Sequence, residues 1–232
     1  MPHLDFSALL QGEYLEWLRA GFLFSLQLTG LTLVFALPLA VSVALLRLAP
    51  SKAARAAGFG FVEAIRNIPL LVHMLFWYFG APEILPDGLK AWLYAGNIEA
   101  VAALIALTLY TAAYMAEDIR SGLRAVPAGQ LQAARALGLS FLGGMRFVVL
   151  PQALRITVPP LISQTLNLWK NTSIATVIGA AELMYQAQRV ETASFRGFET
   201  FAIVTVAYLA ISLFITALAW GFQQRYPVRV AR

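Results

Sequence analysis

Polar and apolar positions divide the chain into long apolar stretches that alternate with shorter polar segments. Five of the stretches can cross the hydrocarbon core of a bilayer, which is about 30 Å thick and takes about 20 helical residues. They cover about residues 20–46, 57–80, 100–118, 156–181 and 200–222. The pattern predicts an all-α integral membrane protein of about five transmembrane helices, with residues 1–232 forming a single domain.

The composition supports a lipid environment rather than a core folded in water. Hydrophobic residues make up 59% of the chain, charged residues 12%, and the mean hydropathy is +0.70. Soluble domains carry about 25% charged residues. The net charge of +5 does not come from a basic run of the kind that binds nucleic acid. We therefore expect the partner of the apolar surface to be a lipid bilayer and expect no nucleic acid.

Charged residues are distributed unevenly between the segments that join the stretches. Residues 81–99 and 182–199 carry more acidic than basic residues. The other joining segments and the C-terminus hold eleven of the 17 Lys and Arg residues: Arg47, Lys52, Arg55, Arg120, Arg124, Arg135, Arg146, Arg155, Arg225, Arg229 and Arg232. Because cytoplasmic loops of membrane proteins carry an excess of Lys and Arg, we expect the N-terminus outside and the C-terminus in the cytoplasm.

The longest polar segment lies between the third and fourth stretches and predicts a further helix. Pro127 suits the first turn of a helix, and the residues after it are rich in the helix formers Ala, Leu, Gln and Arg. Gly138 would interrupt this helix, Gly143 and Gly144 would end it, and Pro151 would mark another break. We expect this helix at about residues 127–142, outside the membrane.

One face of the expected helix carries small and apolar residues. One stripe at spacings of three and four consists of Leu131, Ala134 and Leu137-Gly138, with Gln132, Arg135 and Arg146 beside it. A short helix of this kind suits insertion into a groove on a partner protein. It also suits a helix that rests on lipid headgroups, and the residue pattern alone leaves both interpretations open.

A motif with fixed spacing runs through the same segment. It reads Gln132-Ala133-Ala134, three residues, Gly138, nine residues, Val148-Val149-Leu150-Pro151. It resembles the cytoplasmic signature of ABC-importer permeases, which reads Glu-Ala-Ala, three residues, Gly, nine residues, Ile-x-Leu-Pro. Further segments resemble the branch that imports polar amino acids: 66–72, 113–120, 129–138, 150–155 and 170–174. Residues 178–201 resemble permeases for glutamate and aspartate.

The resemblance implies a type I ABC importer permease architecture with a cytoplasmic coupling helix between the third and fourth spans. A second permease subunit, identical or paralogous, would complete the translocation path. Two cytoplasmic ABC ATPase subunits would receive the coupling helices and hydrolyse ATP, and a periplasmic or tethered binding protein would deliver the substrate. The chain would then be no enzyme, would need no cofactor, and would lie in the bacterial cytoplasmic (inner) membrane. Consistently, it has no phosphate loop of the type Gly-x4-Gly-Lys-Ser/Thr.

The resemblance also implies which residues couple the chain to the ATPase. They are Gly129, Gln130, Gln132, Ala133, Ala134, Gly138, Leu150 and Pro151. Two positions depart from the family pattern, because Gln132 stands where Glu is usual and His73 stands where Gln is common. Gln132 keeps the length and helix propensity of Glu but removes its charge, which puts a salt bridge to the ATPase in doubt and leaves helix docking intact.

Polar residues inside the fourth stretch are the main candidates for a substrate path. A charge at mid-membrane costs at least about 2.5–3.5 kcal/mol, so it usually faces protein or water. Lys170 is expected near the middle of this span, and Gln164, Asn167 and Asn171 fall on one helical face. Lys170 either contacts the substrate or only pairs with Glu63, Glu117 or a partner subunit. Because this face has no carboxylate, it favours acidic or neutral polar amino acids, and the resemblance favours glutamate and aspartate.

Other polar residues in the stretches are open to two interpretations. Ser173 belongs to the same segment as Lys170, and His73 is either a substrate contact or a neutral, hydrogen-bonded histidine. Ser25 and Gln27 either line the cavity or bond across helices. We expect structural roles for the remaining candidates, with Glu117 and Arg120 paired one turn apart and Pro69 bending its helix; these candidates are Arg66, Pro69, Glu117 and Arg120.

Two other classes of protein fit the sequence less well. A stand-alone secondary transporter or channel often shows matched halves, which five spans cannot supply. A membrane enzyme would need a metal cluster, a nucleophile with its base, or paired carboxylates. The chain has no cysteine, and His3 and His73 are its two histidines, so we expect no metal site.

Overall fold

The computed structural model of the chain describes residues 4–227. His3, Arg229 and Arg232 lie outside the described residues. All elements within residues 4–227 are helices: η1 (Ser7–Leu9), α1 (Gly12–Leu48), α2 (Lys52–Arg66), α3 (Leu70–Leu75), η2 (Phe76–Gly80), η3 (Ala81–Ile84), α4 (Asp87–Ala95), α5 (Ile98–Ala125), α6 (Ala128–Ala136), α7 (Phe141–Gly144), η4 (Met145–Val149), α8 (Leu150–Asn171), η5 (Thr172–Ile178), α9 (Leu183–Ser194) and α10 (Gly197–Arg225).

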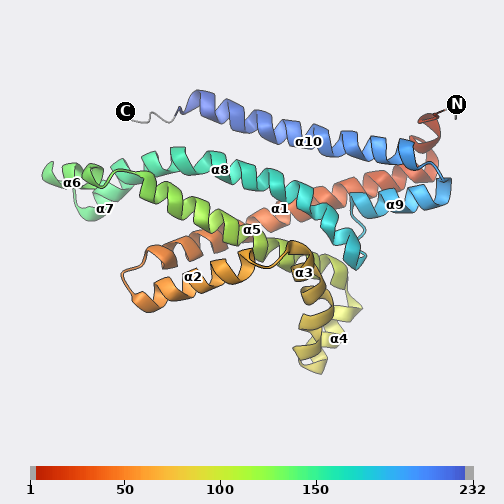
Figure 1. The fold of residues 1–232 in the computed structure, drawn as a ribbon, viewed down its shortest axis with the longest axis horizontal. Helices are drawn as coiled ribbons and strands as arrows, with labels where there is room; N and C mark the ends of the chain where they lie inside the picture. Colours follow the sequence, from red (N-terminus) through yellow and green to blue (C-terminus); the bar gives the residue numbers. More distant parts are fainter. Residues whose placement is uncertain (1–3, 228–232) are drawn as a thin grey trace.

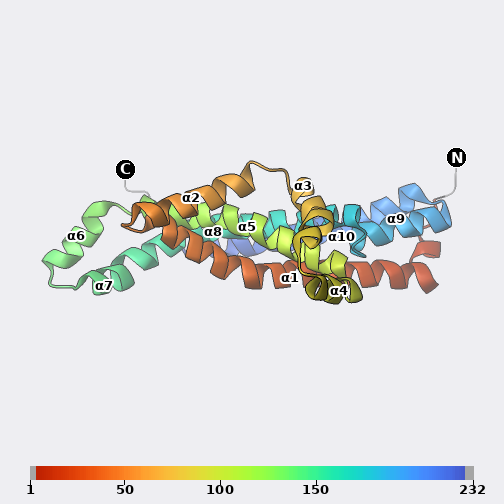
Figure 2. The same ribbon diagram turned by 90° about the horizontal axis from the view of Figure 1, so that it is seen from below.

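The long helices α1, α5, α8 and α10 run along the long axis of the molecule (Figure 1). At one end, α6 and α7 project beyond the other helices, and α10 ends nearby (Figures 1 and 2). The N-terminal residues and α9 lie at the opposite end. The end with α6 also holds the α1–α2 connection, so the segments that the charge pattern places on one side of the membrane do lie together.

Four helical segments are long and apolar enough to cross a membrane: Gly12–Leu48, Ile98–Ala125, Phe141–Ile178 and Gly197–Arg225. Three of them extend beyond both ends of the stretch expected from hydropathy, whereas Phe141–Ile178 begins before residue 156 and ends before residue 181. A fifth span arises if α2 and the segment Leu70–Ile84 are counted together, although the two are bent by 98°. The structure therefore has four or five candidate spans.

The second stretch was expected as one span at residues 57–80, and the structure breaks it at Pro69. Pro69 has no backbone N–H and disfavours helical geometry in the residue before it. α2 accordingly ends at Arg66, and Pro69 caps a new helix, its carbonyl accepting hydrogen bonds from the N–H groups of Val72 and His73 at 2.9 and 3.2 Å. Pro69 therefore separates two helices that lie at 98° to each other, rather than kinking one continuous helix.

The fourth stretch, expected at residues 156–181, also differs. α8 begins earlier, at Leu150, directly after the wider π-helical turn η4, and Pro151 lies in its first turn; the expected break at this proline is absent. The α-helix ends at Asn171 and tightens into the 3₁₀ segment η5, which Gly179 ends at φ +83°. Lys170 therefore lies in the last turn of α8 and not near the middle of a continuous helix.

Small residues allow α1 and α5 to approach closely. Ala36, Ala40 and Ala44 of α1 are fully buried in one cluster with Ala112 and Ala116 of α5. In a bilayer, where the solvent is itself apolar, such close packing is a main source of helix association. The shared α1–α5 interface forms the centre of the molecule.

At the end opposite α6, the buried carboxylate of Glu182 joins three helices. It accepts hydrogen bonds from the N–H groups of Met184 and Tyr185 at 2.9 and 2.8 Å, which caps the N-terminus of α9. The hydroxyls of Tyr208 in α10 and Ser25 in α1 donate to it at 3.1 and 3.5 Å. This network holds α1, α9 and α10 together.

Candidate functional site: a polar pocket and a projecting helical end

Polar side chains of α5 and α8 face each other across a pocket of about 450 Å³. Its volume suits a small molecule of the size of an amino acid. The pocket lies inside the region that the apolar stretches define as membrane-spanning. It is lined by Tyr110, Thr111, Tyr114, Gln164, Asn167, Leu168, Lys170 and Asn171.

The expected polar face of α8 is present and lines this pocket. Gln164, Asn167 and Asn171 lie at helical spacings of three and four, and all three belong to the lining. The Nε2 of Gln164 donates to Asp118 Oδ2 of α5 at 2.9 Å, and Asn167 Nδ2 donates to Gln164 Oε1 at 3.5 Å. The Gln164–Asp118 hydrogen bond connects α5 and α8 beside the pocket.

Lys170 lines the pocket with an exposed side chain. Its two expected intramolecular partners are engaged elsewhere, because Glu63 accepts from Asn67 at 3.1 Å and Glu117 pairs with Arg47 and Arg120. Within residues 4–227, Lys170 forms no ion pair. The ammonium group is therefore available to a ligand in the pocket or to another subunit.

The break in the second stretch brings further side chains behind the pocket. The guanidinium of Arg66 lies 4.7 Å from the centre of the Tyr114 ring, a distance at which a cation is attracted to an aromatic face. His73 packs edge-on against Tyr110, with the ring centres 6.2 Å apart, and its Nε2 lies 3.1 Å from the Ile65 carbonyl oxygen. His73 is thus buried and hydrogen-bonded, one layer away from the pocket.

Besides His73, three of the expected substrate-path residues lie outside the pocket lining. The Ser173 hydroxyl donates to the Lys170 carbonyl at 2.7 Å. Ser25 is buried against α9, where its Oγ accepts from the Leu183 N–H at 3.1 Å, so it bonds across helices. Gln27 is exposed on α1. Of the expected substrate-path residues, four line the pocket: Gln164, Asn167, Lys170 and Asn171.

Sequence reasoning missed the α5 wall of the pocket. Tyr110, Tyr114 and Asp118 recur at a spacing of four, which places them on one helical face. The Tyr110 hydroxyl donates to the Tyr114 hydroxyl at 3.3 Å. This polar stripe inside an apolar stretch was the available signal, and it has the same form as the stripe that was recognised on α8.

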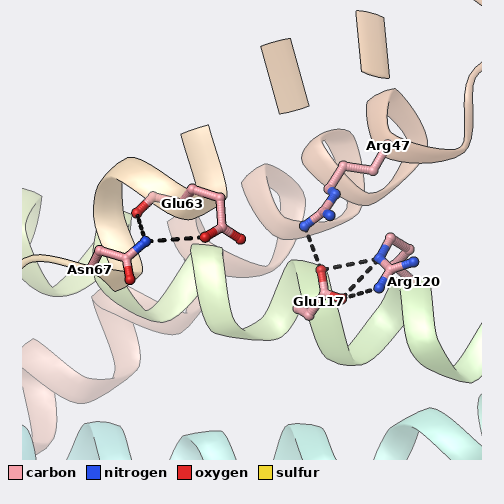
Figure 3. Close-up of polar contacts among 5 residues, drawn as sticks. All are labelled: Arg47, Glu63, Asn67, Glu117 and Arg120. Atoms are coloured by element: carbon pink, nitrogen blue, oxygen red, sulfur yellow. Dashed lines mark hydrogen bonds and ion pairs between the residues drawn. The ribbon is translucent and has the colours of Figure 1, made fainter. Parts of the chain in front are cut away.

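An ion-pair cluster ties α1 to α5 near the α6 end of the molecule. Glu117 of α5 lies between Arg47 of α1, whose Nη1 is 2.5 Å from Glu117 Oε2, and Arg120 of its own helix (Figure 3). The expected pair of Glu117 and Arg120 is therefore present. Glu63, by contrast, is hydrogen-bonded to Asn67, which directly follows its own helix (Figure 3).

The expected coupling helix corresponds to α6, which is shorter than residues 127–142. Pro127 precedes α6, and the helix ends after Ala136 because Gly138 adopts the left-handed conformation at φ +89°. The Gly138 N–H donates to the Arg135 carbonyl and the Leu139 N–H to the Ala134 carbonyl, the hydrogen bonds of a glycine-ended helix. Gly143 and Gly144 lie in the next helix, α7, rather than ending the first.

The small-residue face of α6 packs inward. Ala134 is buried, and a Cβ added at Gly144 of α7 would lie 2.7 Å from Leu131 Cδ1. Leu137 points away and is 86% exposed. The expected single stripe is therefore divided, with Leu131 and Ala134 holding α6 to α7 and Leu137 left on the surface.

The remaining expected coupling residues cover the outside of this end. Gln132 and Ala133 are exposed on α6, and Leu142 of α7 is 77% exposed. Exposed apolar side chains on a short projecting helix pair are typical of a protein docking surface. We call this surface the docking end; it consists of Gly129, Gln130, Gln132, Ala133, Leu137, Gly138, Phe141, Leu142 and Phe147, and the expected residues Leu150 and Pro151 begin α8 directly behind it.

The fold and the two sites together define a membrane transport component. Helices long enough to span a bilayer enclose a polar pocket, and a docking end projects at one end of the same helices. The chain belongs to the family of binding-protein-dependent transport system inner membrane components, whose model matches residues 36–226.

Relatives of known name agree with this membership. The chain is 35% identical over 206 residues to the glutamate/aspartate import permease protein GltJ of Escherichia coli (strain K12), covering 87% of this chain and 84% of the relative. It is 36% identical over 225 residues to the probable glutamine ABC transporter permease protein GlnP of Bacillus subtilis (strain 168), covering 96% and 99%. The resemblance to permeases of amino-acid ABC importers is confirmed.

Solved structures agree as well. A chain in the crystal structure of an amino acid ABC transporter with histidines is 30% identical, has a TM-score of 0.82, and is matched over 96% of this chain and 99% of its own length. A chain of the inward-facing MetNI methionine ABC transporter is 19% identical with a TM-score of 0.67, covering 91% and 99%, which shows the fold alone. The expected all-α, type I permease fold is confirmed, and the chain is a permease subunit rather than the ATP-hydrolysing one.

Proposed function

We propose that the chain is the permease subunit of an importer for acidic amino acids, with glutamate and aspartate as the preferred substrates. The observation that carries this proposal is the position of Lys170 in the lining of the α5–α8 pocket. None of the described lining residues is Asp or Glu, so Lys170 gives the pocket a positive charge. An ammonium group can bind a substrate carboxylate through a charge-assisted hydrogen bond.

The polar groups around Lys170 fit the rest of an amino acid. The amides of Asn167 and Asn171 both donate and accept hydrogen bonds, and the two tyrosine hydroxyls of α5 add further donors on the opposite wall. Arg66, on the far side of the Tyr114 ring, adds a second positive charge near the pocket. Asp118, beside this wall, is hydrogen-bonded to Gln164 and is not part of the described lining. The balance of charge favours an anionic side chain.

Coupling to ATP hydrolysis is proposed to pass through the docking end. In this proposal two cytoplasmic ABC ATPase subunits bind α6 and its neighbours, a second permease subunit (identical or paralogous) completes the path, and a periplasmic or tethered binding protein delivers the substrate. The exposed apolar side chains around Gly138 support an interface with protein, and the inward packing of Ala134 supports a rigid end that can transmit force. Leu150 and Pro151 connect this end directly to α8, which carries the pocket.

The proposed orientation places the docking end in the cytoplasm of a bacterium and α9 outside its inner membrane. The excess of Lys and Arg in the segments at the docking end supports it. The N-terminus would then be outside and the C-terminus inside.

Uptake in a strain that lacks the gene tests the substrate proposal. Cells complemented with the wild-type chain should accumulate labelled glutamate or aspartate in preference to glutamine, histidine and arginine. Lys170→Gln should lower acidic amino-acid uptake by about 10–100-fold, the loss expected for one charged hydrogen bond. Lys52→Gln is the matched control, because Lys52 is exposed at the start of α2, away from the pocket. Unchanged glutamate uptake by Lys170→Gln at equal membrane content would contradict the proposal.

A further inference from the structure

A second polar cavity lies at the α6 end of the molecule, outside the α5–α8 pocket. It has a volume of about 700 Å³ and opens between the start of α8 and the end of α10. In Figure 1, α10 ends above the first half of α8, on the side of the molecule that carries α6. The cavity is lined by Gln130, Gln152, Arg155, Ile156, Arg225, Tyr226 and Pro227.

The charge of this cavity is positive. Arg155 and Arg225 both have exposed side chains, and within residues 4–227 neither forms an ion pair or a side-chain hydrogen bond. None of the described lining residues is acidic. Gln152 Nε2 donates to Gln130 Oε1 at 3.4 Å, which joins the two uncharged amides in the wall and leaves both guanidinium groups to face an anion.

The cavity lies at the level of lipid headgroups. α10 has 29 residues and is therefore about 43 Å long at 1.5 Å per residue, longer than a hydrocarbon core of about 30 Å. Its outer surface is apolar and exposed, and Trp220, 66% exposed, lies just before its end; aromatic residues of this kind mark the membrane–water boundary. Arg225, the last residue of α10, is thus placed where the phosphates of a bilayer lie.

We propose that this cavity binds the phosphate headgroup of an anionic phospholipid of the surrounding bilayer, held between Arg155 and Arg225. The guanidinium group binds phosphate oxygens through two parallel hydrogen bonds, and basic pockets between helices at the membrane surface suit such headgroups. The Tyr226 hydroxyl and the Gln130 and Gln152 amides can donate to the remaining headgroup oxygens. α10 packs against α8 and α9 through Tyr208, which contacts Trp169 and Glu182, and the lipid would add a link between α8 and α10 at their ends near α6. This inference rests on the membrane-spanning fold and is independent of the substrate.

Lipid binding to the purified full chain tests the proposal. The chain is held in neutral detergent and titrated with dioctanoyl phosphatidylglycerol, dioctanoyl phosphatidylcholine or inorganic phosphate, and the bound fraction is measured by native mass spectrometry. Phosphatidylglycerol should bind at least about tenfold more tightly than phosphatidylcholine, because the two differ in net charge. Inorganic phosphate, which has no acyl chains to lie along α10, should bind more weakly than phosphatidylglycerol.

Variants connect the binding to the cavity. Arg155→Gln and Arg225→Gln should each weaken phosphatidylglycerol binding by about fivefold, the effect of one basic residue at an anionic surface. Arg225→Lys keeps the charge and should retain most of the binding. Arg124→Gln, in the last turn of α5 and outside the lining, should change it by less than about twofold.

Four results would overturn the proposal. Equal affinity for the two lipids would refute the preference for an anionic headgroup. Phosphatidylglycerol binding that neither arginine variant changes would show that the lipid does not bind in this cavity. Inorganic phosphate that binds as tightly as phosphatidylglycerol would make this a site for a soluble anion. Arginine variants that lose ATPase association while phosphatidylglycerol binding is unchanged would assign the cavity to a protein partner.

Discussion

In the α5–α8 pocket, polar side chains face one another inside a segment whose outer surface is apolar, whereas at the docking end large apolar side chains are exposed. In a bilayer, Lys170 and its amide neighbours avoid lipid by facing protein or water. At the docking end, Leu137 and Leu142 are exposed beyond the spans, and a partner protein can cover them. In both regions the polarity of the side chains differs from that of their surroundings. The pocket has polar side chains in an apolar segment, and the docking end has apolar side chains in an exposed segment.

The largest expected effect breaks the docking end alone. Gly138→Asp places a side chain at φ +89°, where residues with a Cβ cost about 1–2 kcal/mol, and adds a charge beside the exposed leucines. Association with the ATPase should be abolished while membrane insertion is unchanged, as measured by co-purification and membrane content. Gly88→Asp is the control, since Gly88 in α4 has open space and no positive φ. Co-purification of Gly138→Asp at the wild-type yield would refute the assignment.

The next effect changes the pocket alone. Asn171→Asp adds a carboxylate to the lining, so the ratio of basic to acidic amino-acid uptake should rise about tenfold. ATPase association should stay the same. Gln188→Glu makes the same amide-to-carboxylate change at an exposed position of α9, outside this lining, and should leave the ratio unaltered. Equal uptake ratios for Asn171→Asp and the wild type would count against the pocket as the substrate path.

A smaller effect concerns the packing that joins the two regions. A Cβ at Gly122 of α5 would overlap Thr157 Oγ1 of α8 and lie 3.0 Å from its Cβ. Gly122→Ala should therefore lower the free energy of unfolding by about 1–3 kcal/mol, seen as a lower melting temperature in detergent. Adding Thr157→Ala should restore part of the loss. Gly221→Ala, with open space around it, serves as the control. Equal melting temperatures for all three variants would show that the close contact between Gly122 and Thr157 does not contribute to stability.

The smallest expected effect is in the ion-pair cluster. Glu117→Gln removes the charge that binds Arg47 of α1 and Arg120 of α5, and the partly exposed pair should lose about 1–2 kcal/mol of stability. Glu63→Gln removes a carboxylate that accepts a hydrogen bond from Asn67 of the same segment (Figure 3) and forms no ion pair within residues 4–227, so it should change stability by less than about 0.5 kcal/mol. If the melting temperature falls equally in both variants, Glu117 does not stabilise the contact between α1 and α5 more than Glu63 stabilises its own segment.

Hydrophobic patterning was sufficient for the class of fold and for one wall of the pocket. The α8 face of Gln164, Asn167 and Asn171 depends only on helical spacing, which sequence shows directly. It was not sufficient where the chain changes direction. The stretch at residues 57–80 is apolar enough on average to be expected as one span, yet the helices diverge by 98° at Pro69. This bend brings Arg66 and His73 behind the α5 wall.

The residue at which α8 ends and the way α6 packs could not be predicted from the hydrophobic pattern either. Residues 172–178 are apolar enough to continue a span, and periodicity does not separate an α-helix from the 3₁₀ segment η5. Ala134 and Leu137 occupy one stripe of the sequence, but only the tertiary contact with Gly144 shows that the first of them faces inward. Contacts between residues far apart in the sequence determine which side chains face inward, and such contacts could not be predicted from this single sequence.

Transport by the purified chain in proteoliposomes tests the central claim most directly. Vesicles would contain the chain alone, or the chain with its ATPase subunits, its second permease and its binding protein, and uptake of labelled glutamate would be followed with and without ATP. The account predicts uptake only in the complete assembly and only with ATP. Glutamate uptake by the chain alone would contradict it, because a subunit driven through its docking end has no means to move substrate without the ATPase.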